Sequence, residues 1–413
     1  MSWYRIALAV LLFATLSPAK ELMRVSDDEM IIRGLLYEEY KAYEPARQIF
    51  GKLYDETGEQ TYLFKEATDA LMGNTHIAES IDRLKAWDSQ HPDSIEVNRL
   101  LIPLYLTVRK TKLAKKQAEF LLEKSKKPMD LELASNPFLY SGEFKRALGI
   151  LSKVYEQTHR EDVLLRMADI MDEYTDQRQK AIQLLETHRR MNISSQDLYA
   201  KLLLLYGKQK DIDGIIEIYK ALYKQNPRKA FLQKIVEGYA YKRDLESAVK
   251  FMEEMGVKSE MLFDLYKATK QYDKALKLAD YFYTQTKKPK WLAEKAVLTF
   301  ESAKDKNDKK MISDVIKTFD EAISKGVDDS IYLNYYGYTL IDKDIDVKKG
   351  MKILKDALKQ QPDNTYYLDS LAWGYYKERQ CDKAYKTMKR VVDEEGLEEP
   401  EIISHWRAIR QCK

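Results

Sequence analysis

Residues 34–50 read GLLYEEYKAYEPARQIF, and residues 372–388, near the other end of the chain, read AWGYYKERQCDKAYKTM. The two stretches share a spacing of small and large side chains. Offsets of 3, 9, 12 and 16 from Gly34 fall on Tyr37, Tyr43, Ala46 and Phe50. The same offsets from Ala372 fall on Tyr375, Cys381, Ala384 and Met388, where Cys381 stands in the place of Tyr43. Small residues at two points let two helices approach closely, so each stretch predicts a helix–turn–helix unit.

The position of Ala46 can be followed along the chain at a period close to 34 residues. It falls in order on Ser80, Ala147, Ala181, Ile215, Ala248, Ala275, Val315, Gly350 and Ala384. The step from 248 to 275 is only 27, which predicts a shortened pair whose second helix is capped by Gly256. The step from 275 to 315 is 40, which predicts extended helices around residues 291–310. The copy around Lys112–Lys116 is degenerate, and its register is left open.

Turn residues follow the same period. Pro92, Pro227 and Pro362 stand where one unit must end and the next begin. Proline lacks an amide hydrogen and fixes φ, so it stops one helix and readily starts another. Residues 141–144, 210–212 and 270–272 are the expected short turns between the two helices of a unit.

These residues resemble the tetratricopeptide repeat family over nearly the whole chain. Roughly 370 repeat residues at the family period correspond to about eleven copies, and the rival armadillo and HEAT repeats have longer periods. The resemblance implies an all-α, right-handed superhelical solenoid over residues 20–397. It also implies a C-terminal capping helix within residues 398–413, since a terminal repeat otherwise turns an apolar face to water.

The best-matching part is the tail. Residues 333–338 (LNYYGY) and 362–373 (PDNTYYLDSLAW) look like the closing repeats of exported bacterial tetratricopeptide proteins of the cell envelope. Residues 399–412 then have the pattern of an amphipathic capping helix. This resemblance implies protein partners in the envelope.

The N-terminus has the features of an export signal. Arg5 precedes an uncharged apolar run, Ile6–Leu16, and Ser17-Pro18-Ala19 provides small residues before Lys20. This pattern predicts cleavage after Ala19 and a periplasmic protein. The apolar run is shorter than the roughly 20 residues that span a bilayer. An uncleaved anchor is the alternative, and peripheral membrane association is compatible with either.

Cys381 and Cys412 are the only cysteines. In an oxidising compartment a nearby pair predicts a disulfide, which here would fasten the capping helix to the last repeat. A redox switch or an intermolecular bridge is the alternative reading.

Composition and motifs disfavour several functions. The 413 residues carry a net charge of +3, without the basic stripe that nucleic-acid binding requires. No zinc, P-loop, dinucleotide or nucleophile-elbow signature is present. The histidines (His76, His91, His159, His188 and His405) are scattered and are expected on the surface or in turns. We therefore expect no enzyme activity, no cofactor and no metal site.

Aromatic residues are abundant, with 29 Tyr, 12 Phe and 5 Trp. Most suit packing between helices. Four of them, Tyr338, Tyr366, Trp373 and Tyr376, fall where the family presents residues to its concave groove, and these are the candidate partner-binding residues. Packing against the capping helix is the alternative, above all for Trp373. The family's Lys–Asn clamp for a peptide carboxylate has no match at Lys65/Asp69, Glu132/Asn136 or Asp369/Trp373.

The expected function is a non-enzymatic scaffold or adaptor in the bacterial periplasm, holding other envelope proteins in its concave groove. Motor, pilus, outer-membrane and export machineries all fit this description. The alternative is an envelope protein that binds peptidoglycan or another polysaccharide, for which groove aromatics are suited.

Overall fold

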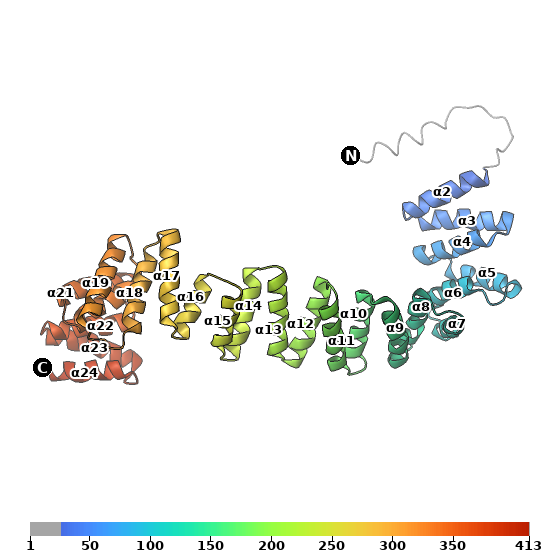
Figure 1. Ribbon diagram of the computed structural model, residues 1–413. Coiled ribbons are helices and arrows are strands. Elements are labelled where there is room, and N and C mark those ends of the chain that lie inside the picture. The colour runs from blue at the N-terminus through green and yellow to red at the C-terminus, as the bar shows by residue number, and fades with distance from the viewer. Residues whose placement is uncertain (1–25, 413) are drawn as a thin grey trace, which may run out of the picture. The chain divides into compact units, whose positions relative to one another are not determined.

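The computed structural model describes residues 26–412, and these residues form 23 helices and no strand. The helices follow one another as eleven antiparallel pairs and a final single helix (Figure 1). We call the first helix of each pair the A helix and the second the B helix. The result is an all-α solenoid of tetratricopeptide-like pairs, as predicted. The export signal predicted for residues 1–19 lies outside the described residues.

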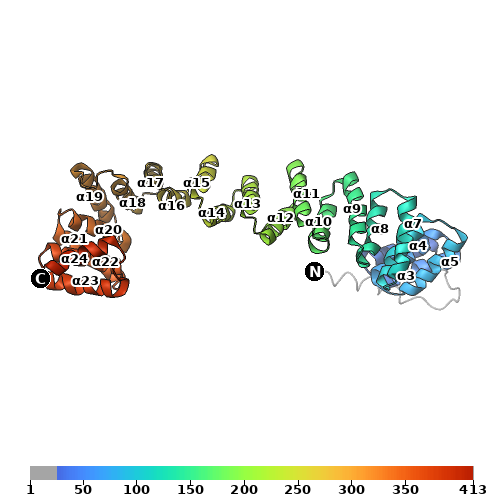
Figure 2. The same cartoon turned by 90° about the horizontal axis from the view of Figure 1, so that it is seen from below.

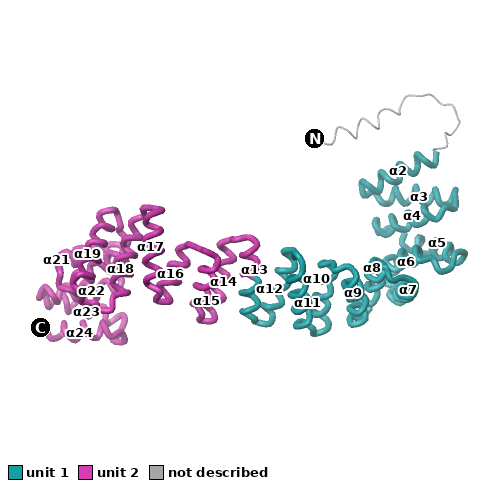
Figure 3. The backbone as a smooth tube through the Cα atoms, viewed as in Figure 1, with its two compact units in different colours: residues 1–218 teal, residues 219–413 magenta. Residues whose placement is uncertain are grey.

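Two compact units divide the chain, residues 1–218 and 219–413, with the boundary inside α13 (Figure 3). The pairs up to this boundary are α2 (Asp27–Glu39) with α3 (Tyr43–Thr57), α4 (Gln60–Gly73) with α5 (Ile77–Gln90), α6 (Ile95–Thr107) with α7 (Thr111–Lys124), α8 (Pro128–Tyr140) with α9 (Phe144–Thr158), α10 (Glu161–Glu173) with α11 (Arg178–Met191), and α12 (Gln196–Gln209) with α13 (Ile212–Gln225).

The second unit continues the same order (Figure 2). Its helices are α14 (Lys229–Tyr241) with α15 (Leu245–Glu254), α16 (Glu260–Ala268) with α17 (Tyr272–Thr286), α18 (Lys290–Ser302) with α19 (Lys309–Ser324), α20 (Ser330–Asp342) with α21 (Val347–Gln360), α22 (Thr365–Lys377) with α23 (Cys381–Glu395), and the single helix α24 (Pro400–Gln411).

The recurring small position is the point where each B helix meets its A helix. The residues fully buried there include Ala46, Ala147, Ala181, Ala248, Ala275, Val315 and Ala384. Ala114 of α7 is also fully buried, 34 residues after Ser80, and this supplies the register left open around Lys112–Lys116. The predicted period therefore describes the packing of both units.

Ile215 departs from this pattern, because it is only half-buried. In α13 the close approach occurs one residue earlier: a Cβ added at Gly214 would lie 2.3 Å from the ring of Tyr206 in α12. A glycine at this point accommodates the large ring, so the neighbouring isoleucine is turned partly outward.

Most of the corners between an A and a B helix share one backbone conformation. After α2, Lys41 has φ 56°, its amide donates to the Glu38 carbonyl, and the Ala42 amide donates to the Tyr37 carbonyl at 2.8 Å. This pair of hydrogen bonds satisfies the last carbonyls of the helix. The same pair recurs with left-handed residues at Arg109, Gly142, Lys210, Arg243, Lys270 and Arg379. The three predicted turns are thereby confirmed.

The two irregular steps have different causes. The 27-residue step arises from short helices, because α15 has 10 residues and α16 has 9, and Gly256 with φ 65° follows the end of α15 as predicted. The prediction for the 40-residue step is partly wrong. Helix α18 has the ordinary 13 residues, and the added length lies in the connection 303–308 and in the 16-residue α19.

Within residues 26–412 we find no helix with both the length and the apolar character needed to cross a membrane.

Candidate binding face on the A helices of the second unit

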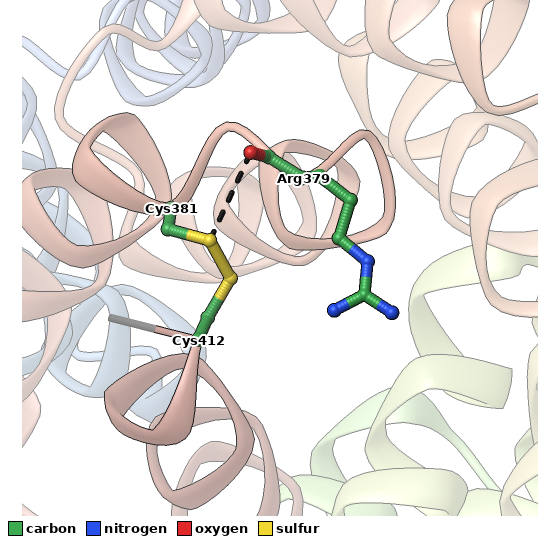
Figure 4. The surroundings of a disulfide bond; sticks show 3 residues. All are labelled: Arg379, Cys381 and Cys412. Atoms are coloured by element: carbon green, nitrogen blue, oxygen red, sulfur yellow. Dashed lines mark hydrogen bonds between the residues drawn. A yellow bond between two sulfur atoms is a disulfide. The ribbon is translucent and has the colours of Figure 1, made fainter.

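The C-terminal helix is fastened to the last pair by the predicted disulfide. Cys381, the first residue of α23, is bonded to Cys412 at the end of α24, and their Cα atoms are 5.6 Å apart (Figure 4). Helix α24 packs against both α22 and α23, and its residues Ile402 and Ile409 are buried there. It therefore takes the place that the A helix of a further pair would occupy.

Two of the four candidate groove residues, Trp373 and Tyr338, meet α24, and a third, Tyr376, is stacked on Trp373. The indole of Trp373 is stacked on the imidazole of His405, with ring centroids 4.2 Å apart, and on the ring of Tyr376 at 4.8 Å. The ring of Tyr338, from α20, lies 6.1 Å from the His405 ring, and its hydroxyl donates to Glu401. The alternative reading of Trp373, packing against the capping helix, is thus what the structure shows.

Tyr366 stands apart from this cluster. It lies in the first turn of α22 with 60% of its surface exposed, and it takes no part in the ring stack. A partner-binding role for Tyr338, Tyr366, Trp373 and Tyr376 stays a prediction, and Tyr366 is the member most open to a partner.

His405 is buried, at 4% exposure, which corrects the expectation that it lies on the surface. Its Nδ1 lies 2.9 Å from a carboxylate oxygen of Asp369, and this contact holds α24 against α22. His188 is likewise buried, with its Nδ1 2.8 Å from the hydroxyl of Tyr155. The expectation from the sequence was wrong for both histidines because their partners come from other helices, at separations of 36 and 33 residues.

The Nε1–H of Trp373 is buried without an acceptor in the described structure. A buried donor of this kind costs about 1–3 kcal/mol when it is left unpaired. Lys377, one turn later, lies with its Nζ 5.4 Å from the Trp373 ring and donates to Asp344 at 2.7 Å.

Two tyrosines of α20 that sequence reasoning missed extend the same face. The hydroxyl of Tyr332 donates to Glu294 of α18 at 2.8 Å, and Lys267 of α16 donates to the same carboxylate at 2.9 Å. The hydroxyl of Tyr335 donates to Glu301, also on α18, at 2.5 Å. These contacts join the A helices α16, α18 and α20. We use the term A-helix face for the surface formed by these side chains together with Tyr338, Trp373, Tyr376, Glu401 and His405, and with the exposed Tyr366, which lies two turns before Trp373 on the same side of α22.

Burial raises the pKa of Tyr332, Tyr335 and Tyr338 above the ordinary range, and their hydrogen bonds to carboxylates act in the same direction. These hydroxyls therefore stay protonated and act as fixed hydrogen-bond donors at physiological pH. A signal was available in the sequence, since α20 carries four tyrosines in seven residues, 332–338, at spacings that place three of them on neighbouring turns.

The positions of the family's carboxylate clamp are occupied by intramolecular contacts. Lys65 donates to Glu38, Glu132 accepts from Arg160, and Asp369 contacts His405. A terminal carboxylate would have to displace these partners.

Among residues 26–412, no group of three or more His, Cys, Asp or Glu side chains is arranged to hold a metal ion.

No family model and no curated protein matches the chain. Among solved structures the chain is similar to one described as "Crystal structure of APC/C hetero-tetramer Cut9-Hcn1", with 11% identity, coverage of 99% of both chains and a TM-score of 0.35. At that score the likeness carries no functional meaning, and the fold assignment rests on the helix pairs described above.

Proposed function

We propose that the chain is a non-enzymatic scaffold that binds other proteins through the A-helix face of its second unit, in the bacterial periplasm as part of a cell-envelope assembly. A tetratricopeptide-like solenoid is suited to such a role, because stacked pairs build an extended surface without a deep catalytic pocket.

The observation that carries the proposal is the composition of the A-helix face. It presents tyrosine hydroxyls, carboxylates and an indole held in place by contacts between neighbouring A helices. Tyr and Trp contribute large contact areas and lose little rotamer entropy on binding. Because these contacts already order the side chains, a partner would not have to order them when it binds.

Glycan binding is the less favoured alternative. Sugars stack on free aromatic faces, whereas Trp373 already carries His405 and Tyr376 in parallel stacks. Retention of purified peptidoglycan by the protein, with no protein partner recovered, would support this alternative instead.

The test is in-cell crosslinking followed by purification of the full-length protein from envelope fractions. We expect reproducible protein partners, and their recovery should fall when exposed Tyr366 is changed to Ala. The matched control is Tyr241→Ala, since Tyr241 lies in the same unit at 78% exposure but outside the A-helix face. No reproducible partner, or equal loss with both variants, would overturn the proposal.

The location has its own test. Residues 1–30 fused to a reporter that is active only outside the cytoplasm should give activity. An inactive reporter would overturn the periplasmic part and leave the scaffold part standing.

A further inference from the structure

The longest connection between an A and a B helix in the described chain, residues 303–308, borders a cavity of about 860 Å³. The cavity lies between the N-terminal half of α19 and the corner that joins α20 to α21. None of its lining residues belongs to the A-helix face.

Large rings pack where α19 meets α20. Phe319 of α19 is stacked on Tyr336 of α20 with centroids 5.0 Å apart, and it meets Tyr335 at 6.1 Å. The ring contact between α19 and α20 is thus made at Phe319, in the C-terminal half of α19, whereas the cavity lies beside the N-terminal half of that helix.

The connection itself is held in place. The Nζ of Lys306 donates to the Glu301 carbonyl at 2.9 Å, and Lys343 donates to the Asn307 side chain at 3.1 Å. Asp308 caps α19 by accepting from the Met311 amide at 2.8 Å. The connection that borders the cavity is therefore ordered by specific hydrogen bonds, and one of them, from Lys343 to Asn307, joins two residues of the cavity lining.

The floor of the cavity is aliphatic. Ile312 is buried, Ile316 is half-buried, and Ile345 in the α20–α21 corner is 52% exposed. Ile345 has half its surface in water and lines the same cavity as the other two isoleucines, so covering it with an apolar side chain is favourable.

The rim carries unbalanced positive charge. Asp342 is paired with Lys343 at 3.0 Å, and Asp344 is paired with Lys377 at 2.7 Å. Lys309 and Lys317 also line the cavity, and both are exposed with no ion pair to any described residue. Both acidic groups of the lining are thus neutralised, and two ammonium groups remain free beside an apolar floor.

We propose that this cavity binds an acidic amphipathic segment of a partner protein, with aliphatic or aromatic side chains on Ile312, Ile316 and Ile345 and carboxylates on Lys309 and Lys317. The charge and the floor select this occupant, since an apolar anchor fits the isoleucines and flanking Asp or Glu complements the lysines. The inference rests on the proposed scaffold function and adds a second contact site to it.

The probe is a fluorescein-labelled peptide of about 14 residues, four helical turns, with Leu along one face and Glu beside it. Its fluorescence anisotropy is titrated with the full-length protein at about 0.15 M salt, where long-range attraction between exposed charges is screened. We expect saturable binding, and we expect the double variant Lys309→Glu/Lys317→Glu to bind at least about tenfold more weakly. Ile345→Ser should also weaken binding, because it removes apolar floor.

The matched control is Lys304→Glu/Lys310→Glu. These lysines are also exposed and lack an ion pair within the described chain, but they do not line the cavity. The control should bind within about twofold of the unaltered protein, and a peptide with Lys in place of Glu should not bind. Circular dichroism melts of both double variants should match, since all four side chains lie in water.

Equal affinity in the two double variants, or no saturable binding of the acidic peptide, would overturn the proposal. Oleate serves as a second probe. Binding of oleate together with no binding of the peptide would also overturn the proposal, in favour of an anionic lipid. The proposed scaffold function is judged separately by partner recovery from envelope fractions. If every partner is recovered with the Lys309→Glu/Lys317→Glu variant, the cavity proposal fails and the scaffold proposal stands. If the peptide binds but no partner is recovered, the cavity proposal stands and the scaffold proposal fails.

Discussion

Replacing Cys381 and Cys412 together by Ser should release α24 while leaving the preceding pairs folded. Their sequence separation is 31 residues. Closing a loop of that length removes chain entropy from the open state equivalent to about 3.7 kcal/mol at 25 °C. A helix of 12 residues is marginal by itself. Without the disulfide, α24 is held by the burial of Ile402 and Ile409 and by the contact of His405 with Asp369.

The assay is amide hydrogen exchange read by mass spectrometry. If the whole 3.7 kcal/mol acts on the opening of α24, protection of amides in residues 402–411 should fall by up to about 500-fold, since each 1.4 kcal/mol is tenfold. Amides of α8, in the other unit, serve as the internal control and should not change. Adding reductant to the double Ser variant should also change nothing.

A loss of protection below about fivefold in α24 would refute this reasoning. It would mean that side-chain packing alone keeps the helix in place. A loss that extends equally into α20 and α21 would refute a different part, the assumption that the end of the stack opens independently of the pairs before it.

Four further outcomes follow from particular residues. Gly350→Ala should lower the free energy of unfolding by about 1–2 kcal/mol, because its Cβ would lie 2.6 Å from the Gly337 carbonyl oxygen and overpacking outweighs the gain in helix propensity. Gly149→Ala should instead raise the free energy of unfolding by up to about 1 kcal/mol, because Gly149 lies in a helix and an added Cβ would have no neighbour within 4 Å. Chemical denaturation of both variants tests these two predictions. Gly142→Ala should cost about 1 kcal/mol, since φ there is 77°, whereas Arg243→Gly at an equivalent corner should not destabilise the protein. Burial raises the pKa of Asp69 from 3.8 to about 7. The folded state therefore binds the carboxyl proton more tightly than the unfolded state does, and the free energy of unfolding falls as the pH rises between those two values. Asp69→Asn should therefore raise the melting temperature more at pH 8 than at pH 5, and an equal shift at both pH values would contradict that assignment.

Much of the fold could be read from spacing. Ala46, Ala147 and Ala384 recur in phase because every B helix must approach its A helix at one crowded point, and a small side chain at that point is a local requirement. The disulfide could also be predicted from the sequence, because the only two cysteines fall at the start of one predicted helix and the end of the next.

The candidate site was predicted only in part. Tyr338, Trp373 and Tyr376 were singled out, but their meeting with His405 depends on α24 lying across α22 close to α20, and no repeat pattern contains that information. Tyr332 and Tyr335 were passed over because their partners, Glu294 and Glu301, are 38 and 34 residues away. Contacts of one repeat length are visible only when the stacking of neighbouring A helices is known.

The amino-acid sequence by itself determined the helix pairs, their number, their register outside the copy around Lys112–Lys116, and the covalent fastening at the C-terminus, since each depends on periodic burial or on residue type within one pair and its neighbour. Tertiary structure alone decided which side chains share the A-helix face, which histidines are buried, and where α19 and α20 part to leave a cavity. The physical reason is that these features depend on contacts between successive pairs, such as Phe319 of α19 stacked on Tyr336 of α20, which the periodic spacing within one pair does not specify.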